Sequence, residues 1–252
     1  MENKFSLAGK VALITGGGTG IGFDMAKCML ASGANVIITG RREAVLQEAV
    51  NSLGAGAFYF VHDMADVSAT PSLVADIIQS HGKIDILVNN AGINMKRPAI
   101  EVSNDDFAQI IQVNLNAVFV LSREVGKHML ERKSGSIIMI SSMAAYYGID
   151  RVAAYASSKS GLYGLVRVLA SEWSAHGVRV NAIAPGFIET AMSKTAMNSD
   201  PDRKHKAMDR TPMGYFGKPE DVAWTAVFLA SDAAGYITGV SIPVDGGNSI
   251  GF

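Results

Sequence analysis

A single cysteine, Cys28, occurs among the 252 residues, so no disulfide can form within the chain. Charge of one sign is also lacking, because 22 Lys and Arg stand against 23 Asp and Glu. Without surplus cations to neutralise phosphates, nucleic-acid binding is not expected. There is no run of about 18 apolar residues and no apolar core of a signal peptide near Met1, so we expect neither a membrane span nor secretion. These absences predict a cytoplasmic protein.

Close spacing of metal-ligating side chains is missing too. The histidines are scattered, and no metal site is expected: His62, His81, His128, His176 and His205. Hydrophobic residues make up 48% of the chain and charged residues only 18%, which predicts a well-filled core rather than disorder.

Short apolar runs alternate with longer helical patterns from one end of the chain to the other. The expected strands are Val11–Thr15, Val36–Thr39, Phe58–Val61, Ile84–Val88, Gly135–Ile140, Val178–Ala184 and Val240–Val244. The expected helices are Gly20–Ser32, Glu43–Leu53, Ser68–His81, Asn104–Arg132, Val152–His176 and Pro219–Ala230. This alternation predicts an α/β fold, a doubly wound parallel sheet covered on both faces, in a single domain over residues 1–252. The long polar stretch 187–218 is interpreted as a functional loop.

A glycine-rich turn, from Gly16 to Gly22, follows the first expected strand. Such a turn lets a pyrophosphate approach a helix N-terminus, although glycines also follow strands for steric reasons alone. A nucleoside triphosphate site is not favoured, because the Gly-Lys-Ser/Thr ending is missing. After the second strand stand Arg41 and Arg42, where an acidic residue would bind the ribose hydroxyls of NAD. They are solvated surface charges or, as we favour, ligands of the 2′-phosphate of NADP.

Tyr155 and Lys159 are four residues apart in an expected helix and therefore lie on one face. An ammonium beside a phenol stabilises the phenolate and fits the tyrosine for proton transfer, although most pairs at this spacing are incidental helical contacts. Ser142 ends a strand, where a hydroxyl can hold a substrate oxygen or merely cap its own turn. Asn114 interrupts a largely apolar helical stretch and needs a hydrogen-bonding reason to be there.

Together these residues resemble the classical short-chain dehydrogenase/reductase family along nearly the whole chain. The motifs that carry the resemblance are the Thr15–Gly22 turn, Asp63, Asn89-Asn90-Ala91-Gly92, Asn114, Ser142, Tyr155-x-x-x-Lys159, Asn181, and Pro185-Gly186 followed by Thr190. The resemblance implies a Rossmann-like domain with a seven-stranded sheet, and a homotetramer to which the apolar segment Ile242–Phe252 could contribute.

The resemblance also implies roles for the matched residues. Tyr155 would exchange a proton with the substrate oxygen, Ser142 would orient that oxygen, Lys159 would lower the tyrosine pKa and hold the nicotinamide ribose, and Asn114 would anchor a water. The residues expected to bind the cofactor are Gly16, Gly18, Thr19, Gly20, Ile21, Gly22, Arg41, Arg42, Asp63, Met64, Asn90, Ala91, Gly92, Tyr155, Lys159, Pro185, Gly186, Ile188 and Thr190. Thr19 stands where NADP-dependent relatives often carry a basic residue, so phosphate recognition would rest on Arg41 and Arg42.

The substrate is the least defined part of the prediction. Lys96, Arg97 and Arg151 could pair with a carboxylate, or be solvated charges, and Phe187, with Tyr146 and Tyr147, could form apolar walls. Within the family the resemblance is nearest to gluconate and 2-dehydro-3-deoxygluconate 5-dehydrogenases, which implies an NADP(H)-dependent oxidoreductase acting on a sugar acid. Two alternatives stay open: a reductase of 3-oxoacyl thioesters or small ketones, and a nicotinamide-binding sensor without catalysis.

Overall fold

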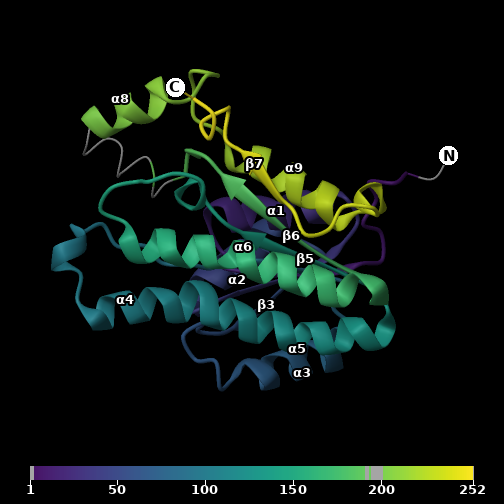
Figure 1. Cartoon of the computed structure of the whole chain (residues 1–252). Helices are drawn as coiled ribbons and strands as arrows, with labels where there is room; N and C mark the ends of the chain where they lie inside the picture. Colours follow the sequence, from purple (N-terminus) through teal and green to yellow (C-terminus); the bar gives the residue numbers. More distant parts are fainter. Residues whose placement is uncertain (1–2, 191–192, 194–200, 252) are drawn as a thin grey trace.

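The computed structural model of the protein describes residues 3–190, 193 and 201–251. Within these residues seven parallel strands form one sheet, and helices cover both of its faces (Figure 1). The strands are β1 (Val11–Thr15), β2 (Asn35–Gly40), β3 (Ala57–Val61), β4 (Ile86–Asn89), β5 (Gly135–Ile140), β6 (Val178–Pro185) and β7 (Ser241–Val244).

The larger helices connect these strands or follow them. They are α1 (Gly20–Ala31), α2 (Glu43–Leu53), α3 (Thr70–His81), α4 (Asn104–Ile111), α5 (Ala117–Arg132), α6 (Ala153–Trp173), α8 (Pro201–Asp209) and α9 (Pro219–Ala230). Short helical turns add η1 (Ala99–Glu101), η2 (Gln112–Asn116), η3 (Met143–Ala145), η4 (Ser174–His176) and η5 (Asp232–Ala234).

The strand order is β3-β2-β1-β4-β5-β6-β7, and every pairing is parallel. The chain moves outward from β1 to β3 and then crosses back to β4 on the other side of β1. In open parallel sheets a crevice forms beyond the carboxyl ends of the strands at such a reversal. The fold therefore places a ligand site next to the ends of β1 and β4.

Alternate residues of each strand face opposite layers of helices. Ile14 and Ile38 belong to a core shared with α1, α2 and α9, whereas Leu13 and Ile37 belong to a core shared with α3, α5 and α6. Figure 1 shows α4, α5 and α6 in front of the sheet and α1 behind it. Because both faces are covered, the central strands read as continuous apolar runs.

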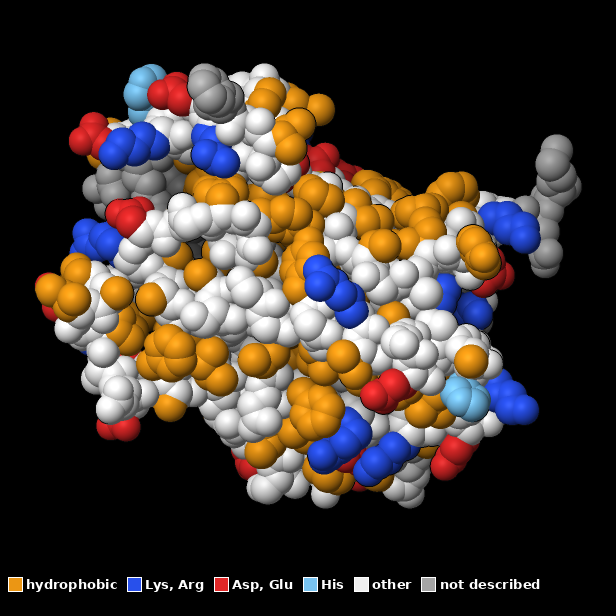
Figure 2. Space-filling view, viewed as in Figure 1, with side chains coloured by type: hydrophobic (Ala, Val, Ile, Leu, Met, Phe, Trp, Pro, Cys, Tyr) orange, Lys and Arg blue, Asp and Glu red, His pale blue; other side chains and the backbone are white. Residues whose placement is uncertain are grey.

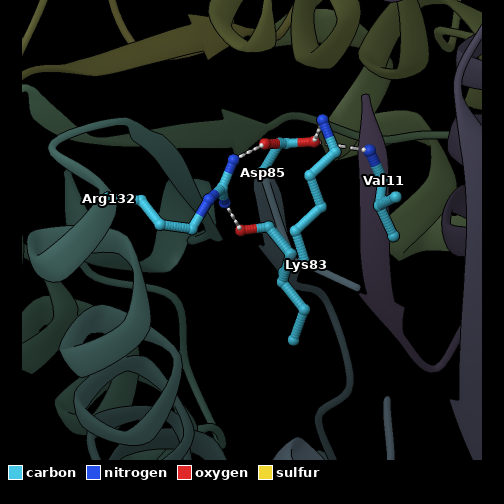
Figure 3. A network of polar contacts seen from close by, with 5 residues as sticks. Val11, Lys83, Asp85 and Arg132 are labelled. Carbon is cyan, nitrogen blue, oxygen red and sulfur yellow. Dashed lines mark hydrogen bonds and ion pairs between the residues drawn. The ribbon is translucent and has the colours of Figure 1, made fainter. Parts of the chain in front are cut away.

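An acidic residue fixes the opposite, amino-terminal edge of the sheet. Asp85, 5% exposed, immediately precedes β4, and its Oδ1 accepts a hydrogen bond from Arg132 Nη2 at 2.6 Å (Figure 3). Its Oδ2 accepts bonds from Lys83 Nζ and from the Val11 backbone N–H, both at 2.9 Å. Burial opposes ionisation, but the contacts with Arg132, Lys83 and Val11 outweigh it and hold the pKa of Asp85 below its ordinary value. This carboxylate ties β1, β4 and the end of α5 together.

The sequence-based prediction of the sheet and of its strands is confirmed, with shifts of one or two residues at most ends. The largest difference lies in the helix expected over Asn104–Arg132, which the structure divides at the π-helical turn η2. Ile84 and Asp85 precede β4 rather than belonging to it, since Asp85 is engaged in the side-chain network. The functional loop expected at 187–218 contains α8, and residues 191–192 and 194–200 lie outside the described part of the chain.

Candidate active site

The glycine turn joins β1 to α1 in a conformation that requires glycine. Gly16 and Gly20 have φ values of 65° and 57°, in the left-handed region that side chains disfavour. Gly22 lies against the Gly16 carbonyl and the Asn90 amide, where a Cβ would not fit. Thr19, the N-cap residue of α1, makes no side-chain capping bond. The backbone N–H groups at this helix start can therefore serve an anion.

The end of β4 is fastened to this turn. Asn90 Nδ2 donates hydrogen bonds to the carbonyls of Thr15 at 2.9 Å and Gly16 at 3.2 Å. The backbone N–H groups of Asn90 and Ala91 both donate to Thr15 Oγ1 at 3.0 Å. Thr190, after β6, lies beside Gly20, because a Cβ built there would be 3.6 Å from its Cγ2. Segments that follow three strands thus meet at one place.

The expected phosphate and adenine ligands occupy the neighbouring strand ends. Arg41 and Arg42 are exposed directly after β2, and Arg42 is the N-cap residue of α2. The glycine turn abuts this helix, since a Cβ built on Gly18 would be 3.2 Å from Val45 Cγ1. Asp63 follows β3, and its Oδ1 caps the local turn by accepting from the Ala65 N–H at 3.0 Å. Both arginines and Asp63 therefore lie along the same edge as the turn.

Tyr155 and Lys159 lie one turn apart on α6, as predicted. Lys159 is 4% exposed, and its Nζ lies 5.6 Å from the centroid of the Tyr155 ring. The ammonium donates a 2.7 Å hydrogen bond to the carbonyl of Ile140, the last residue of β5. Burial lowers the pKa of Lys159 to about 8. The lysine is thus held between α6 and the end of β5.

The environment of Tyr155 differs from the expectation that Lys159 lowers the pKa of its phenol. Burial raises the pKa of Tyr155 above its ordinary value, and a hydrogen bond with the Ser142 hydroxyl lowers it only in part. Ser142 Oγ also accepts from the Ala144 N–H at 3.2 Å, so it caps the short helix η3. Ser142 therefore caps its turn and also faces the phenol.

Asn114 is buried in the π-helical turn and binds the chain that follows β4. Its Oδ1 accepts from the Ile93 N–H and its Nδ2 donates to the Ile93 carbonyl, both at 2.8 Å. The same Nδ2 donates to Ser158 Oγ at 3.2 Å, and Ser158 Oγ donates to the Tyr155 carbonyl at 2.7 Å. A Cβ built on Gly92 would lie 3.1 Å from Asn114 Oδ1 and 3.6 Å from Lys159 Nζ. Asn114, Lys159 and Tyr155 are therefore brought together.

Sequence reasoning missed Ser158 and the π-helical turn. The sequence signal for Ser158 is weak, because Ser157 and Ser158 both precede Lys159 and lie on different faces of the helix. Only the structure shows that Ser158 is the fully buried one. The π-helical turn has no pattern of its own in the sequence. Such turns are rare in proteins overall, but many of those that occur lie at functional sites. The extra residue in the turn changes the direction in which neighbouring side chains point.

The expected substrate cations differ in their surroundings. Arg97 Nη1 pairs with Asp106 Oδ2 at 2.7 Å, so part of its charge is already matched within the chain. The Arg97 N–H donates to the Arg151 carbonyl at 2.8 Å, which joins the segment after β4, where Lys96 also lies, to the segment after η3. Arg151 is exposed and has a φ of 63°, which is uncommon for a residue other than glycine. Strain of this kind often accompanies function.

The expected apolar walls also have defined partners. The Phe187 ring packs against Phe216 with centroids 5.8 Å apart. Tyr146 donates its hydroxyl to the Ser241 carbonyl at 3.2 Å, and the Tyr147 hydroxyl binds Asn248 Oδ1. The two tyrosines thus hold the segment after Ser142 against β7 and the chain that follows it.

A hollow of about 480 Å³ lies beside β7. Neither Ser142 nor Tyr155 lines it; its walls include Phe187, Met213 and Asp245. In the part of the chain that is described, no three His, Cys, Asp or Glu side chains form a group able to hold a metal ion. Over the same residues, no helix has the length and apolarity that a bilayer crossing requires.

Comparisons with known proteins agree with this geometry. The family model described as "Enoyl-(Acyl carrier protein) reductase" matches residues 16–249. A 2-dehydro-3-deoxy-D-gluconate 5-dehydrogenase of Pseudoalteromonas atlantica is 42% identical over 98% of both chains. A 3-oxoacyl-[acyl-carrier-protein] reductase of Thermotoga maritima is 38% identical over 96% of this chain and 98% of its own.

A solved structure is similar over almost the entire fold. The gluconate 5-dehydrogenase of Burkholderia cenocepacia, crystallised with NADP and tartrate, has a TM-score of 0.94 and 32% identity. The alignment covers 99% of this chain and 98% of that enzyme. Sequence and structural likeness therefore extend through every element that positions the site, and the chain belongs to the short-chain dehydrogenase/reductase family.

Proposed function

We propose that the protein is an NADP(H)-dependent oxidoreductase that interconverts a secondary alcohol and a ketone on a sugar acid of the gluconate type. The observation that carries the proposal is the meeting of Tyr155, Lys159 and Ser142 beside the glycine turn, at the carboxyl edge of the sheet. One domain over residues 1–252 supplies both the cofactor site and the catalytic residues, with a substrate loop at 187–218.

The chain's own residues hold and move the proton. A bound nicotinamide supplies or accepts the hydride. In reduction Tyr155 gives its phenolic proton to the substrate oxygen, and in oxidation it removes the proton from the substrate hydroxyl. Ser142, already hydrogen-bonded with the phenol, holds the same oxygen. We assign to the buried Lys159, whose Nζ lies 5.6 Å from the centroid of the Tyr155 ring, the role of stabilising the phenolate, because burial by itself raises the pKa of the phenol.

NADP is favoured over NAD by the residues after β2 and β3. Arg41 and Arg42 offer two exposed guanidiniums on the same edge as the glycine turn, and they suit the 2′-phosphate. We assign to Asp63, which follows β3, a contact with the adenine. We also include in the cofactor set Ile21 in the first turn of α1, Met64 after β3, and Pro185, Gly186 and Ile188 at or after the end of β6. The NADP in the Burkholderia cenocepacia enzyme supports this choice.

The sugar-acid substrate is supported by the names of the relatives and by one cation. Arg151 is exposed, and no ion pair with another described residue is recorded for it, whereas Arg97 pairs with Asp106. Arg151 also follows Ser142 by nine residues in the segment that borders the site. We therefore assign to Arg151 the main contact with the substrate carboxylate, with Lys96 and Phe187 as further candidates.

A reductase of 3-oxoacyl thioesters is the second candidate, because the Thermotoga maritima relative covers the chain almost as completely as the sugar-acid enzymes do. A panel of gluconate, 5-ketogluconate, 2-dehydro-3-deoxygluconate and an acetoacetyl thioester, each with NADP(H) and NAD(H), separates the two. The proposal predicts the highest kcat/KM with a sugar acid and NADP(H). Preference for the thioester would replace it, and cofactor binding without turnover of any member would favour a sensor.

We further propose a homotetramer in the cytoplasm. β7 is an outer strand of the sheet, and the exposed side chains of Met213 and Tyr215 line a hollow beside it. Figure 2 shows apolar side chains gathered over the region where Figure 1 draws β7 and α9. An open strand edge with an apolar border is suited to pairing with another copy. Light scattering after size exclusion measures the mass, and a monomer would contradict the proposal.

A further inference from the structure

Three segments that are far apart in the sequence meet outside the catalytic set. They contribute Tyr147 from the chain after Ser142, Arg210 and Thr211 from the chain after α8, and Asn248 from the chain after β7. These four residues are called the Arg210 junction. None of them has a part in the mechanism proposed above.

The side chains of the junction are closely engaged. The Arg210 guanidinium carbon lies 3.9 Å from the centroid of the Tyr147 ring, a cation–π distance, and Arg210 Nε donates to the Asn248 carbonyl at 3.1 Å. The Tyr147 hydroxyl binds Asn248 Oδ1, and Asn248 Nδ2 donates to Thr211 Oγ1 at 3.1 Å. Asn248 is fully buried, so these bonds satisfy an amide that would be costly to leave unpaired.

Main-chain packing fixes the same segments. The Met213 N–H donates to the Gly246 carbonyl at 3.1 Å. A Cβ built on Gly246 would be 2.9 Å from Thr211 Cγ2, and one built on Gly247 would be 3.0 Å from Pro212 Cγ. Both glycines have positive φ values. The chain after α8 is therefore held at a defined place, and Arg210 is the charged side chain that reaches from it to Tyr147.

Through Tyr147 the junction extends to the catalytic serine. The Tyr147 N–H donates to the Met143 carbonyl at 3.3 Å, and Ser142 caps the turn that contains Met143. Tyr147 follows Ser142 by five positions, and this short segment begins at the group that holds the substrate oxygen. Movement of the Tyr147 ring would therefore be passed to the turn that begins at Ser142.

We infer that Arg210 is a positioning residue for the substrate: by stacking on Tyr147 and binding Asn248 it holds the end of the substrate loop against the segment that starts at Ser142. This inference rests on the proposed oxidoreductase function. Arg210 acts through its planar face and its Nε rather than by binding the substrate carboxylate. Loss of the stack should loosen the substrate site and leave intact the part of the cofactor site that lies at β1 to β4.

The test compares Arg210→Met, Arg210→Lys and Tyr147→Leu in the full-length protein with the sugar acid that wild type turns over best. Arg210→Met should raise KM about tenfold, the change that a desolvated cation–π contact of roughly 1.4 kcal/mol supports. Its kcat should fall much less, and its Kd for NADPH, measured by fluorescence, should stay within about twofold of wild type. Tyr147→Leu should raise KM similarly, and the double variant should add little, because the two residues form one contact.

Arg210→Lys separates positioning from direct binding. Lysine keeps the charge but has no planar face, so its KM should stay close to that of Arg210→Met. The matched control is Arg123→Met, which removes an exposed arginine 5.5 Å from the Phe119 ring on α5, and it should keep wild-type KM.

Restoration of wild-type KM by Arg210→Lys, or unchanged kinetics in Arg210→Met, would overturn the inference. If Arg210→Met raised KM, weakened NADPH binding and lowered the melting temperature to a similar extent, the junction would have only a general structural role. That result would overturn the inference as well. Failure of the proposed function would appear separately, as absence of turnover in the wild-type protein.

Discussion

Lys159 Nζ lies 5.6 Å from the centroid of the Tyr155 ring and gives its hydrogen bond to the carbonyl of Ile140. The ammonium is thus placed near the phenol by two elements, the helix α6 and the end of β5. Burial disfavours the charge on both groups, so it lowers the pKa of Lys159 and raises that of Tyr155. The two pKa values are therefore driven apart, and the perturbation of both groups in one place marks a candidate site for proton transfer.

Tyr155→Phe tests the proton-transfer role. The substitution keeps the ring and removes the hydroxyl, so kcat should fall by about a thousandfold, within the range for loss of a general acid or base. The Kd for NADPH should change little. Tyr163→Phe, on the same helix with its ring against Tyr146, is the control and should keep most of the activity. Near-normal turnover of Tyr155→Phe would remove the tyrosine from the mechanism.

Lys159→Met tests the cost of the buried ammonium. The pKa of Lys159 falls from 10.5 to about 8 on folding, so between those values the unfolded chain binds more protons and wild-type stability rises with pH. Below pH 8 Lys159 is charged in the folded protein as well, so the full free-energy cost of burying the ammonium is present. Removal of the charge stabilises the folded protein, whereas loss of the hydrogen bond to Ile140 destabilises it. The net effect should be to raise the free energy of unfolding by about 2 kcal/mol at pH 7.

The stability gain in Lys159→Met should shrink as the pH is raised from 8 towards 10.5, while catalysis is lost at every pH. Denaturant unfolding of both proteins at pH 7 and pH 10 measures the difference. A variant less stable than wild type at pH 7 would show that the ammonium is better solvated than its burial indicates.

The regular parts of the fold were predictable because their causes are local. Apolar runs such as Gly135–Ile140 coincide with strands since the sheet is covered on both faces, and Gly16 and Gly20 occupy a turn that needs positive φ. That Tyr155 and Lys159 share one helical face followed from their spacing, but their role in proton transfer needed the family resemblance. The motif positions Ser142 and Asn114 needed the family resemblance as well.

What could not be predicted depends on pairings between distant segments. The Asp106 partner of Arg97 and the Asn248 partner of Tyr147 lie on other segments of the chain, and neither charge nor period indicates which side chains meet. The π-helical turn around Asn114 has a similar origin, because hydrogen bonds to Ile93 help to hold it in place. The bonds by which Tyr146 and Tyr147 tie the segment after Ser142 to β7 and the chain beyond it could not be predicted for the same reason.

Replacement of Arg41 and Arg42 by alanine tests the choice of cofactor. Each charge-assisted contact with a phosphate contributes roughly 1.5 to 3 kcal/mol, so the double variant should lose about a hundredfold in kcat/KM for NADPH. The same variant assayed with NADH is its own control and should be nearly unchanged, because NADH has no 2′-phosphate. A parallel loss with both cofactors would show that the arginines support the fold of this edge rather than the phosphate.

Asp85→Asn tests the network at the amino-terminal edge of the sheet. The amide keeps the size of the side chain but leaves Arg132 and Lys83 beside a neutral group, and loss of one partner of a buried ion pair costs about 3 kcal/mol. The pKa of Asp85 in the folded protein lies below the ordinary 3.8. The contribution of the Asp85 carboxylate to stability is therefore fully present above pH 3.8. It is lost as the pH falls through the lower pKa that Asp85 has in the folded protein.

Acid unfolding distinguishes this contribution from a general loss of stability. At pH 7 Asp85→Asn should unfold at a lower denaturant concentration than wild type, and the gap should narrow below pH 3.8 as wild type loses its carboxylate. Asp76→Asn, an exposed position on α3, is the control and should follow wild type throughout. Because Asp85 lies at the edge opposite Tyr155, the variant should keep wild-type KM at temperatures where it is folded. A constant gap at every pH would show that Asp85 stabilises the edge by its shape and hydrogen bonds rather than by its charge.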